Sequence, residues 1–210
     1  MIQTNLFGDT PPPASGPTRP KPVRWREGGA RIEGAYRYHL WRLGLHRQGD
    51  AADAAPTAEL RLLWIMLNPS TADGKEDDAT LRMIITFSYL WGYGGLDVCN
   101  LFAYRATKPA DLKKAEQPVG PDNDRELRDR LHLADGVAFA WGSSGAQVGR
   151  AGAVLKMVHA VSQEPTCRWT RTVALGFTKD GYPVHPLRQR LDLTPIPVRV
   201  TAEGSLERAA

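Results

Sequence analysis

The sequence predicts an α/β protein, a three-layer α/β/α sandwich around a central, mostly parallel sheet of four or five strands. Three observations predict it: short apolar runs of strand length, helix-length stretches that alternate with them, and Asn or His residues where the apolar runs end. Alternation of strands and helices is typical of a parallel sheet covered on both faces. Ligands of such sheets bind outside the carboxyl ends of the strands, so polar residues there are the first candidates for a functional site.

The first half of the domain contains three predicted strands and one predicted helix. Residues 36–43 alternate polar and apolar side chains, as a half-buried strand does. Residues 62–67 and 96–101 are apolar runs with the length of buried strands. Between them, residues 79–90 place apolar side chains at helical spacing, and glycines follow at the expected helix end.

The second half repeats the pattern. Residues 121–124 are typical of a helix cap, so a helix is expected over 125–133. An apolar strand follows over 136–141, and a Gly-Ser turn leads into a helix over 146–161. Residues 172–176 form the last clear strand, and 198–200 are a candidate edge strand.

The length of 210 residues and an apolar content of 42% fit one domain, which we place at residues 25–200. Residues 1–24 are rich in proline and poor in apolar side chains, so a flexible leader is expected there. Residues 201–210 are expected to be a flexible tail.

Several protein classes are excluded by composition. No apolar run reaches the roughly 18 residues that a membrane span needs, and the first residues lack the charged and apolar regions of a signal peptide. Cys99 and Cys167 form no CxxC pair. We therefore expect a cytoplasmic protein without metal or cofactor.

The net charge is only +4, but Lys and Arg cluster at residues 19–31, 168–171 and 179–190. Such clusters either bind a phosphate backbone or form an ordinary solvated surface. The last cluster carries the most weight because it adjoins His185.

Three residues at or after strand ends are the candidate site. Asn68 precedes a proline and either caps a turn or orients a water or substrate group. Asn100 ends a strand, and its amide matches the paired donor and acceptor on the edge of a nucleobase. His185 lies among Lys179, Arg188 and Arg190, which would favour a neutral imidazole that donates one hydrogen bond to a developing anion.

The chain order of these motifs resembles the uracil-DNA glycosylase superfamily. The segment Leu67–Ser70 is similar to the GINPG form of that family's first motif, which reads GQDPYH in another branch. Residues 96–102 resemble its base-reading LLLNTVLT strand, and Ala138–Gly142 with Ala146 and Gln147 resemble FLLWG-xx-AQ. The His185–Leu187 segment is a shortened form of HPSPLS.

From Tyr36 to about Leu191 the chain also resembles DUF1643, a bacterial family of unassigned function. The shared blocks are LNPSTAD, NLFA-RAT, AWG and TKDG-P-HPL, which begin here at Leu67, Asn100, Ala140 and Thr178.

The glycosylase resemblance implies a role for each candidate. Asn100 would read a flipped-out base, His185 would donate to the departing base, and Asn68 would orient the attacking water. The resemblance also implies contacts to the base ring and to DNA. The aromatic candidates beside the base are Phe87, Tyr89, Phe102 and Trp141; the DNA-binding candidates are Ser143, Ser144, Lys179, Leu187, Arg188 and Arg190.

This chain departs from the family where a carboxylate would activate water, because Asn68 is an amide. Asp73 and Asp78 in the following acidic loop are the reserve candidates, although such a loop is also typical of a solvated turn and helix cap. The large loops favour a modified pyrimidine, released in DNA repair or in defence against phage with modified DNA. The alternatives are a non-catalytic nucleic-acid binding module and an enzyme of free nucleosides or nucleotides.

One further motif lies in the leader. Gln3, Leu6 and Phe7 match the Q-x-x-L-F peptide by which bacterial repair proteins bind the sliding clamp. A chance match and a tail that binds its own domain are the alternatives.

Overall fold

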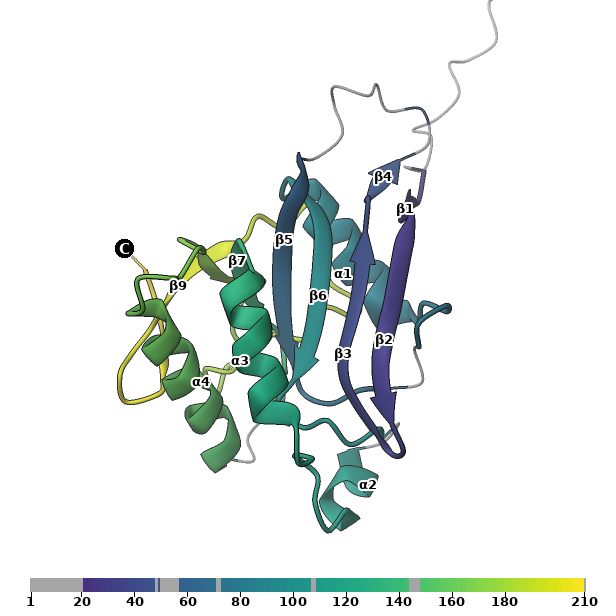
Figure 1. The fold of residues 1–210 in the computed structure, drawn as a ribbon. Coiled ribbons are helices and arrows are strands. Elements are labelled where there is room, and N and C mark those ends of the chain that lie inside the picture. Colours follow the sequence, from purple (N-terminus) through teal and green to yellow (C-terminus); the bar gives the residue numbers. More distant parts are fainter. Residues whose placement is uncertain are drawn as a thin grey trace, which may run out of the picture.

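The computed structural model describes residues 21–47, 49, 57–70, 73–106, 109–143 and 148–209. Its centre is a mixed eight-stranded sheet in the order β10-β9-β8-β7-β5-β6-β3-β2, with helices packed against it (Figure 1). The predicted α/β class is confirmed, whereas the prediction of four or five strands is too low. The predictions for Gln3, Leu6, Phe7 and Ser144 lie outside the described residues.

Four parallel strands form the middle of the sheet, and each contains an apolar run predicted as a strand. They are β5 (Thr57–Met66), β6 (Tyr93–Asn100), β7 (Gly136–Phe139) and β8 (Thr172–Ala174). Strand β5 pairs with β6 on one side and with β7 on the other, and β7 pairs with β8. The run from Leu62 to Ile65 is fully buried because both faces of β5 are covered.

Antiparallel strands extend the sheet at one edge. Strand β3 (Tyr36–Leu43) has the predicted bounds and pairs with β6, and β2 (Glu27–Glu33) pairs with β3 as the outer strand. A separate small sheet joins β1 (Val23–Arg24) to β4 (His46–Arg47). The flexible leader predicted over 1–24 therefore extends too far, because Val23 and Arg24 already pair with another strand.

The opposite edge carries the hairpin of β9 (Ile196–Val200) and β10 (Leu206–Arg208), in which β9 also pairs with β8. The flexible tail predicted over 201–210 is wrong for β10, whose backbone is paired along its length. Its three residues are mostly polar and carry no apolar run that would have marked a strand.

Helices pack on both faces of the sheet (Figure 1). Helix α1 (Ala79–Leu90) packs Leu81 and Ile84 against one face, and α3 (Asn123–Leu133) with α4 (Val148–Ser162) packs against the other. The short α2 (Pro109–Lys114) lies beyond the carboxyl ends of the central strands (Figure 1). None of the helices in the described part of the chain is long and apolar enough to cross a bilayer.

The acidic residue before α3 has another role than the predicted helix cap. Asp122 is the N-cap residue, but its side chain makes no capping hydrogen bond. Its carboxylate instead binds Arg31 of β2 at 2.6 Å and Arg125 at 3.0 Å. The acidic residue before this helix therefore holds the helix to the edge of the sheet.

A fully buried guanidinium anchors the segment that precedes α1. Arg42 of β3 contacts Asp77 at 2.8 Å and donates to the Asp73 carbonyl at 2.9 Å. The same guanidinium lies 4.4 Å from the centroid of the Trp25 ring. This cluster sets the position of the turn from which α1, and with it Asp78, begins.

We predict that Asp77→Ala lowers the free energy of unfolding by about 3 kcal/mol, because it leaves a buried guanidinium without its carboxylate. Urea denaturation measures the change. Glu76→Ala is the matched control: this neighbouring carboxylate is exposed, and its loss should change stability by less than about 0.5 kcal/mol. Equal midpoints for the two variants would contradict the anchoring role of Arg42.

Candidate active site at the carboxyl ends of the central strands

Two adjoining hollows lie at the carboxyl ends of β5, β6 and β7. We call them the inner chamber, with a volume of about 70 Å³, and the outer cleft, with a volume of about 510 Å³. They share five lining residues, so they form one continuous site. The shared residues are Met66, Asn68, Ser70, Thr80 and His185.

The topology of the sheet explains this position. The chain leaves β5 through α1 to β6 on one side, and leaves β7 through α4 to β8 on the other. Neighbouring strands whose connections depart in opposite directions leave a crevice at their carboxyl ends, the usual ligand position in open α/β sheets. The expectation that polar residues would gather at this edge is met.

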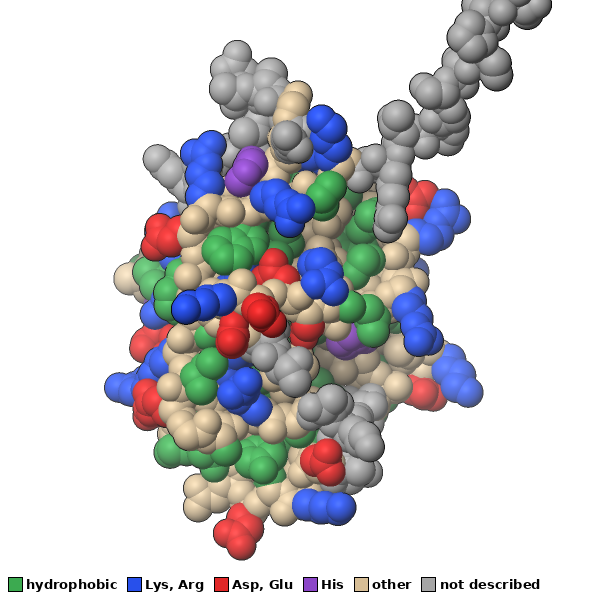
Figure 2. Space-filling model, turned by 90° about the vertical axis from the view of Figure 1, so that its right-hand side faces the viewer, with side chains coloured by type: hydrophobic (Ala, Val, Ile, Leu, Met, Phe, Trp, Pro, Cys, Tyr) green, Lys and Arg blue, Asp and Glu red, His purple; other side chains and the backbone are tan. Residues whose placement is uncertain are grey.

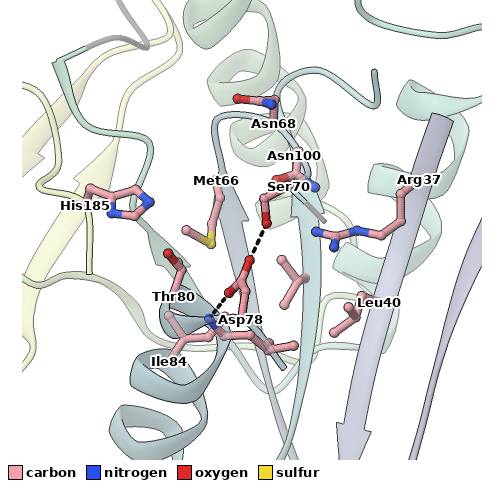
Figure 3. A pocket seen from close by; sticks show the side chains of 12 residues that line it. Arg37, Leu40, Met66, Asn68, Ser70, Asp78, Thr80, Ile84, Asn100 and His185 are labelled. Atoms are coloured by element: carbon pink, nitrogen blue, oxygen red, sulfur yellow. Dashed lines mark hydrogen bonds between the residues drawn. The ribbon is translucent and has the colours of Figure 1, made fainter. Parts of the chain in front are cut away.

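The inner chamber has an apolar floor and a polar wall (Figure 3). The floor is formed by Leu40, Met66, Leu81, Ile84 and Val98. The polar wall is formed by Arg37, Asn68, Ser70, Asp78, Asn100 and His185. The three predicted strand-end residues therefore meet in one cavity, and Asp78 joins them.

Asn100 is the last residue of β6 and is only 1% exposed. Its backbone carbonyl accepts a hydrogen bond of 3.0 Å from the Asn123 side chain, which fixes the strand end. Its own Nδ2 is buried and has no hydrogen-bond partner among the described residues. A buried donor without a partner costs about 1–3 kcal/mol, so this amide indicates a ligand that the site is built to receive.

Asn68 is held by its own turn. Its Nδ2 donates to the Pro69 carbonyl at 2.9 Å and to the Ala106 carbonyl at 2.7 Å, which uses both amide hydrogens. These bonds agree with the turn-capping alternative. Only the side-chain oxygen of Asn68 is left to act on a ligand.

The two reserve carboxylates have different positions. Asp78 caps α1 by accepting from the Leu81 N–H at 2.7 Å, and its second oxygen accepts from the Ser70 hydroxyl (Figure 3). Asp73 instead accepts from the backbone N–H groups of Lys75 and Glu76 and lines neither hollow. Asp73 is therefore an incorrect candidate, whereas Asp78 lies in the chamber and caps the helix at the same time.

His185 is half-buried on the loop after β8. Its Nδ1 lies 3.2 Å from the Leu187 N–H and accepts from it, so the proton of the neutral ring is on Nε2. Burial lowers the pKa of His185 below its ordinary value of 6.5, and Asp78 opposes this effect. The predicted neutral imidazole agrees with this direction, but the cause is burial and not the nearby cations.

Three of the four aromatic candidates are in the core, which corrects their predicted contact with a base. Phe87 is fully buried and contacts the rings of Trp64 and Trp91, and Tyr89 and Phe102 are also buried. None of the three lines the chamber or the cleft. Trp141 does line the outer cleft, and its indole N–H is buried without a partner among the described residues.

Some of the DNA-binding candidates line the outer cleft and others do not. Ser143 and Leu187 line the outer cleft. Lys179, Arg188 and Arg190 are exposed and do not line it, and Arg190 forms an ion pair with Asp192. Arg188 has a left-handed backbone with φ of 67°, which is strained for a residue other than glycine.

Basic side chains do not form one continuous patch on the face shown in Figure 2, where they are interspersed with acidic ones. Arg31, from the first basic cluster, is bound by Glu33, Asp122 and Glu126. Arg168, from the second, is bound by Asp135. Arg31 and Arg168 therefore agree with the alternative of an ordinary solvated surface, because their charges are paired within the protein.

Sequence reasoning missed Arg37 and Ser70 as parts of the site. Ser70 is in the LNPS segment, but its bond to Asp78 depends on how the loop folds back. Arg37 lies in an alternating strand where charged residues are expected to face water, yet it is 5% exposed. No sequence signal indicated that helix α1 would cover that side of β3.

Residues 37–187 match the sequence model of DUF1643, described as a protein of unknown function. The chain belongs to the DUF1643 family. The segment matched to DUF1643 contains every residue that lines the inner chamber and all but Gln189 of the outer cleft. Comparison with curated proteins and with solved structures gives no significant match.

We predict that His185 titrates below 6.5 in the folded protein, whereas His132, whose pKa is raised by its bond to Glu164, titrates above 6.5. NMR titration of the ring Cε1–H signals measures both. The two residues act oppositely on stability. Stability due to His185 is present above its unfolded pKa of about 6.5 and is lost as pH falls from there through the lower folded pKa, whereas stability due to His132 is present below about 6.5 and is lost as pH rises through its higher folded pKa. A His185 signal that titrates above 6.5 would contradict a neutral imidazole.

Proposed function

We propose that this DUF1643 protein is a DNA base glycosylase that flips a pyrimidine out of DNA and hydrolyses its N-glycosidic bond, leaving an abasic site. The observation that carries the proposal is the buried, unpartnered Nδ2 of Asn100 in the same chamber as His185 and Asp78. The motif order that resembles uracil-DNA glycosylases adds support, because these groups lie together in space.

The chamber offers a base two kinds of contact. Asn100 presents an amide that pairs with the edge of a pyrimidine, and the chamber floor supplies apolar contact to the ring. His185 presents Nε2–H, which donates to an oxygen of the base as negative charge develops there. A neutral imidazole suits this step because it can donate this hydrogen bond without first losing a positive charge.

We assign water activation to Asp78 acting through Ser70. The Ser70 hydroxyl donates to Asp78, so the lone pairs of its oxygen remain to accept from a water. As that water attacks the sugar, its proton passes to Ser70 and the Ser70 proton passes to Asp78. The oxygen of Asn68 orients the same water, which gives Asn68 a supporting role.

The outer cleft would hold the sugar and the flanking DNA. Leu187 is 39% exposed at the cleft, next to the strained Arg188, and is suited to fill the gap left by a flipped base. Lys179 is an exposed cation for phosphates, and Ser143 supplies a hydroxyl. Because the cleft is continuous with the chamber, it leaves room for a substituent on the base, so a modified pyrimidine is the preferred substrate; this fits a role in DNA repair or in defence against phage. Binding to the sliding clamp through Gln3, Leu6 and Phe7 is part of the same proposal.

An enzyme of free nucleosides or nucleotides is the second candidate. It is favoured by the interspersed charges of Figure 2 and by the ion pair that occupies Arg190. A non-catalytic binding module is less favoured, because Asp78 brings a carboxylate into the chamber.

We predict that the purified protein releases a base from a panel of duplex and single-stranded DNAs that contain uracil, cytosine and modified pyrimidines. Mass spectrometry identifies the base, and alkaline cleavage counts the abasic sites. Asn100→Ala and His185→Gln should each slow release by about 10²-fold or more, since the first removes the amide that binds the base and the second removes the imidazole Nε2–H that donates to the departing base. His132→Gln is the matched control, because His132 lies on α3, binds Glu164 and lines neither hollow, and it should retain the wild-type rate.

Several results would contradict the proposal. Release from free nucleosides but not from DNA would select the second candidate. DNA binding that weakens with salt and persists in His185→Gln, with no released base, would select the binding module. Full activity of Asn100→Ala would show that the chamber does not receive the base.

A further inference from the structure

One charged group in the chamber has no part in the proposed mechanism. Arg37 projects from β3 into the inner chamber, opposite His185, with Ser70 and Asp78 between them (Figure 3). Its side chain is almost fully buried, at 5% exposure, and its backbone N–H is held by the Ala103 carbonyl at 2.9 Å. The guanidinium therefore lies beside the space that a ligand would occupy.

The charges around the chamber make Arg37 its source of positive charge. His185 is held neutral by burial, so it supplies a proton donor but not a cation. Arg42 is bound to Asp77 and does not line the chamber. Among the described residues that line the chamber, Arg37 is the permanent cation and Asp78 is the carboxylate.

Burial of this guanidinium is unfavourable in the free protein. It lowers the pKa of Arg37 to about 10, and nearby Arg105 adds to the decrease while Asp78 opposes it. Arg37 still keeps its charge at neutral pH. A cation held in a poorly solvated cavity interacts most strongly with a ligand that becomes negative there, so it stabilises a transition state more than a neutral ground state.

We propose that Arg37 is a catalytic residue whose guanidinium stabilises the negative charge that develops on the leaving base. This inference rests on the proposed glycosylase function. When the bond between the sugar C1′ and the base nitrogen breaks, its electron pair moves onto the base ring. Water oxygen forms the new bond to C1′, its proton leaves through Ser70 to Asp78, and the base anion is held by Arg37 and His185 until it is protonated.

This role differs from the roles of the other chamber residues in one measurable way. The amide of Asn100 recognises a base whatever its leaving ability. A group that stabilises a leaving anion matters most when that anion is basic, and least when the ring already disperses the charge. Substitution of Arg37 should therefore make the release rate depend more steeply on the acidity of the base.

The test measures single-turnover release from matched oligonucleotides that carry uracil or 5-fluorouracil, and cytosine or 5-fluorocytosine. Fluorine changes the size of the ring little and makes it a better leaving group. For Arg37→Met we expect release of the unsubstituted base to fall by about 10²-fold, and release of the fluorinated partner to fall several-fold less. Arg37→Lys keeps the charge and should recover part of the loss. DNA affinity and thermal unfolding, measured on each variant, report whether the fold and binding persist.

The possible outcomes separate the two proposals. If the wild type releases no base from any DNA, the glycosylase proposal fails and the role of Arg37 fails with it. If the wild type is active and Arg37→Met slows both members of a pair equally, or leaves both unchanged, the role of Arg37 alone is overturned. If Arg37→Met does not fold, the fluorine effect is measured on Arg37→Lys. A reduced release rate of Arg37→Lys, with an unchanged ratio of the rates for the fluorinated and unsubstituted bases, would also overturn the role of Arg37.

Discussion

The reversal of winding direction between β5 and β7, two parallel strands, is the constraint on which the rest of this structure depends. Helix α1 returns the chain to one side of β5 and α4 returns it to the other side of β7. These two returns run in opposite directions along the sheet, so a crevice opens where the strands end. All of the polar groups that we assign to the site either follow one of these strands or lie on an element packed beside them.

The same place concentrates groups that weaken the fold. The buried amide nitrogen of Asn100 has no hydrogen-bond partner among the described residues, and the guanidinium of Arg37 is buried in a cavity with an apolar floor. Burial of each group is unfavourable, because the amide loses hydrogen bonds to water and burial lowers the pKa of the guanidinium. The surrounding structure maintains them: Asn123 fixes the end of β6, and Arg42 fixes the segment that carries Asp78. Unfavourable burial of polar groups at one edge of a sheet is typical of a site organised for a ligand.

Much of this arrangement could be predicted from local sequence. The apolar runs predicted the four parallel strands, and the polar residues at their ends predicted which side chains would meet. Chain order placed Asn68, Asn100 and His185 together because carboxyl ends of parallel strands lie at one edge. The antiparallel strand β2 was not predictable in the same way, since its glycines and charges carry no apolar alternation and its pairing depends on β3.

The roles of individual side chains were less predictable, for reasons of packing. Phe87 and Phe102 had the right residue type to stack on a base, but burial depends on which helix face meets the sheet. Asp73 and Asp78 lie in the same acidic loop of the sequence, and only the position at which α1 begins decides which one reaches the chamber. Arg37 was hidden by its alternating strand, because α1 covers the side that was expected to face water. The site is thus predictable where strand ends decide it, and not where tertiary packing does.

The central claim is that the free Asn100 amide binds the base. The direct measurement is the ¹⁵N–¹H signal of that side chain when the protein binds a duplex with one 2′-fluoroarabino-uridine or -cytidine, whose electron-withdrawing fluorine slows cleavage. We expect the Asn100 amide protons to shift as they form a new hydrogen bond, while those of Asn123, already bound to backbone carbonyls, stay in place. An Asn100 signal that is unchanged by bound DNA would contradict the account.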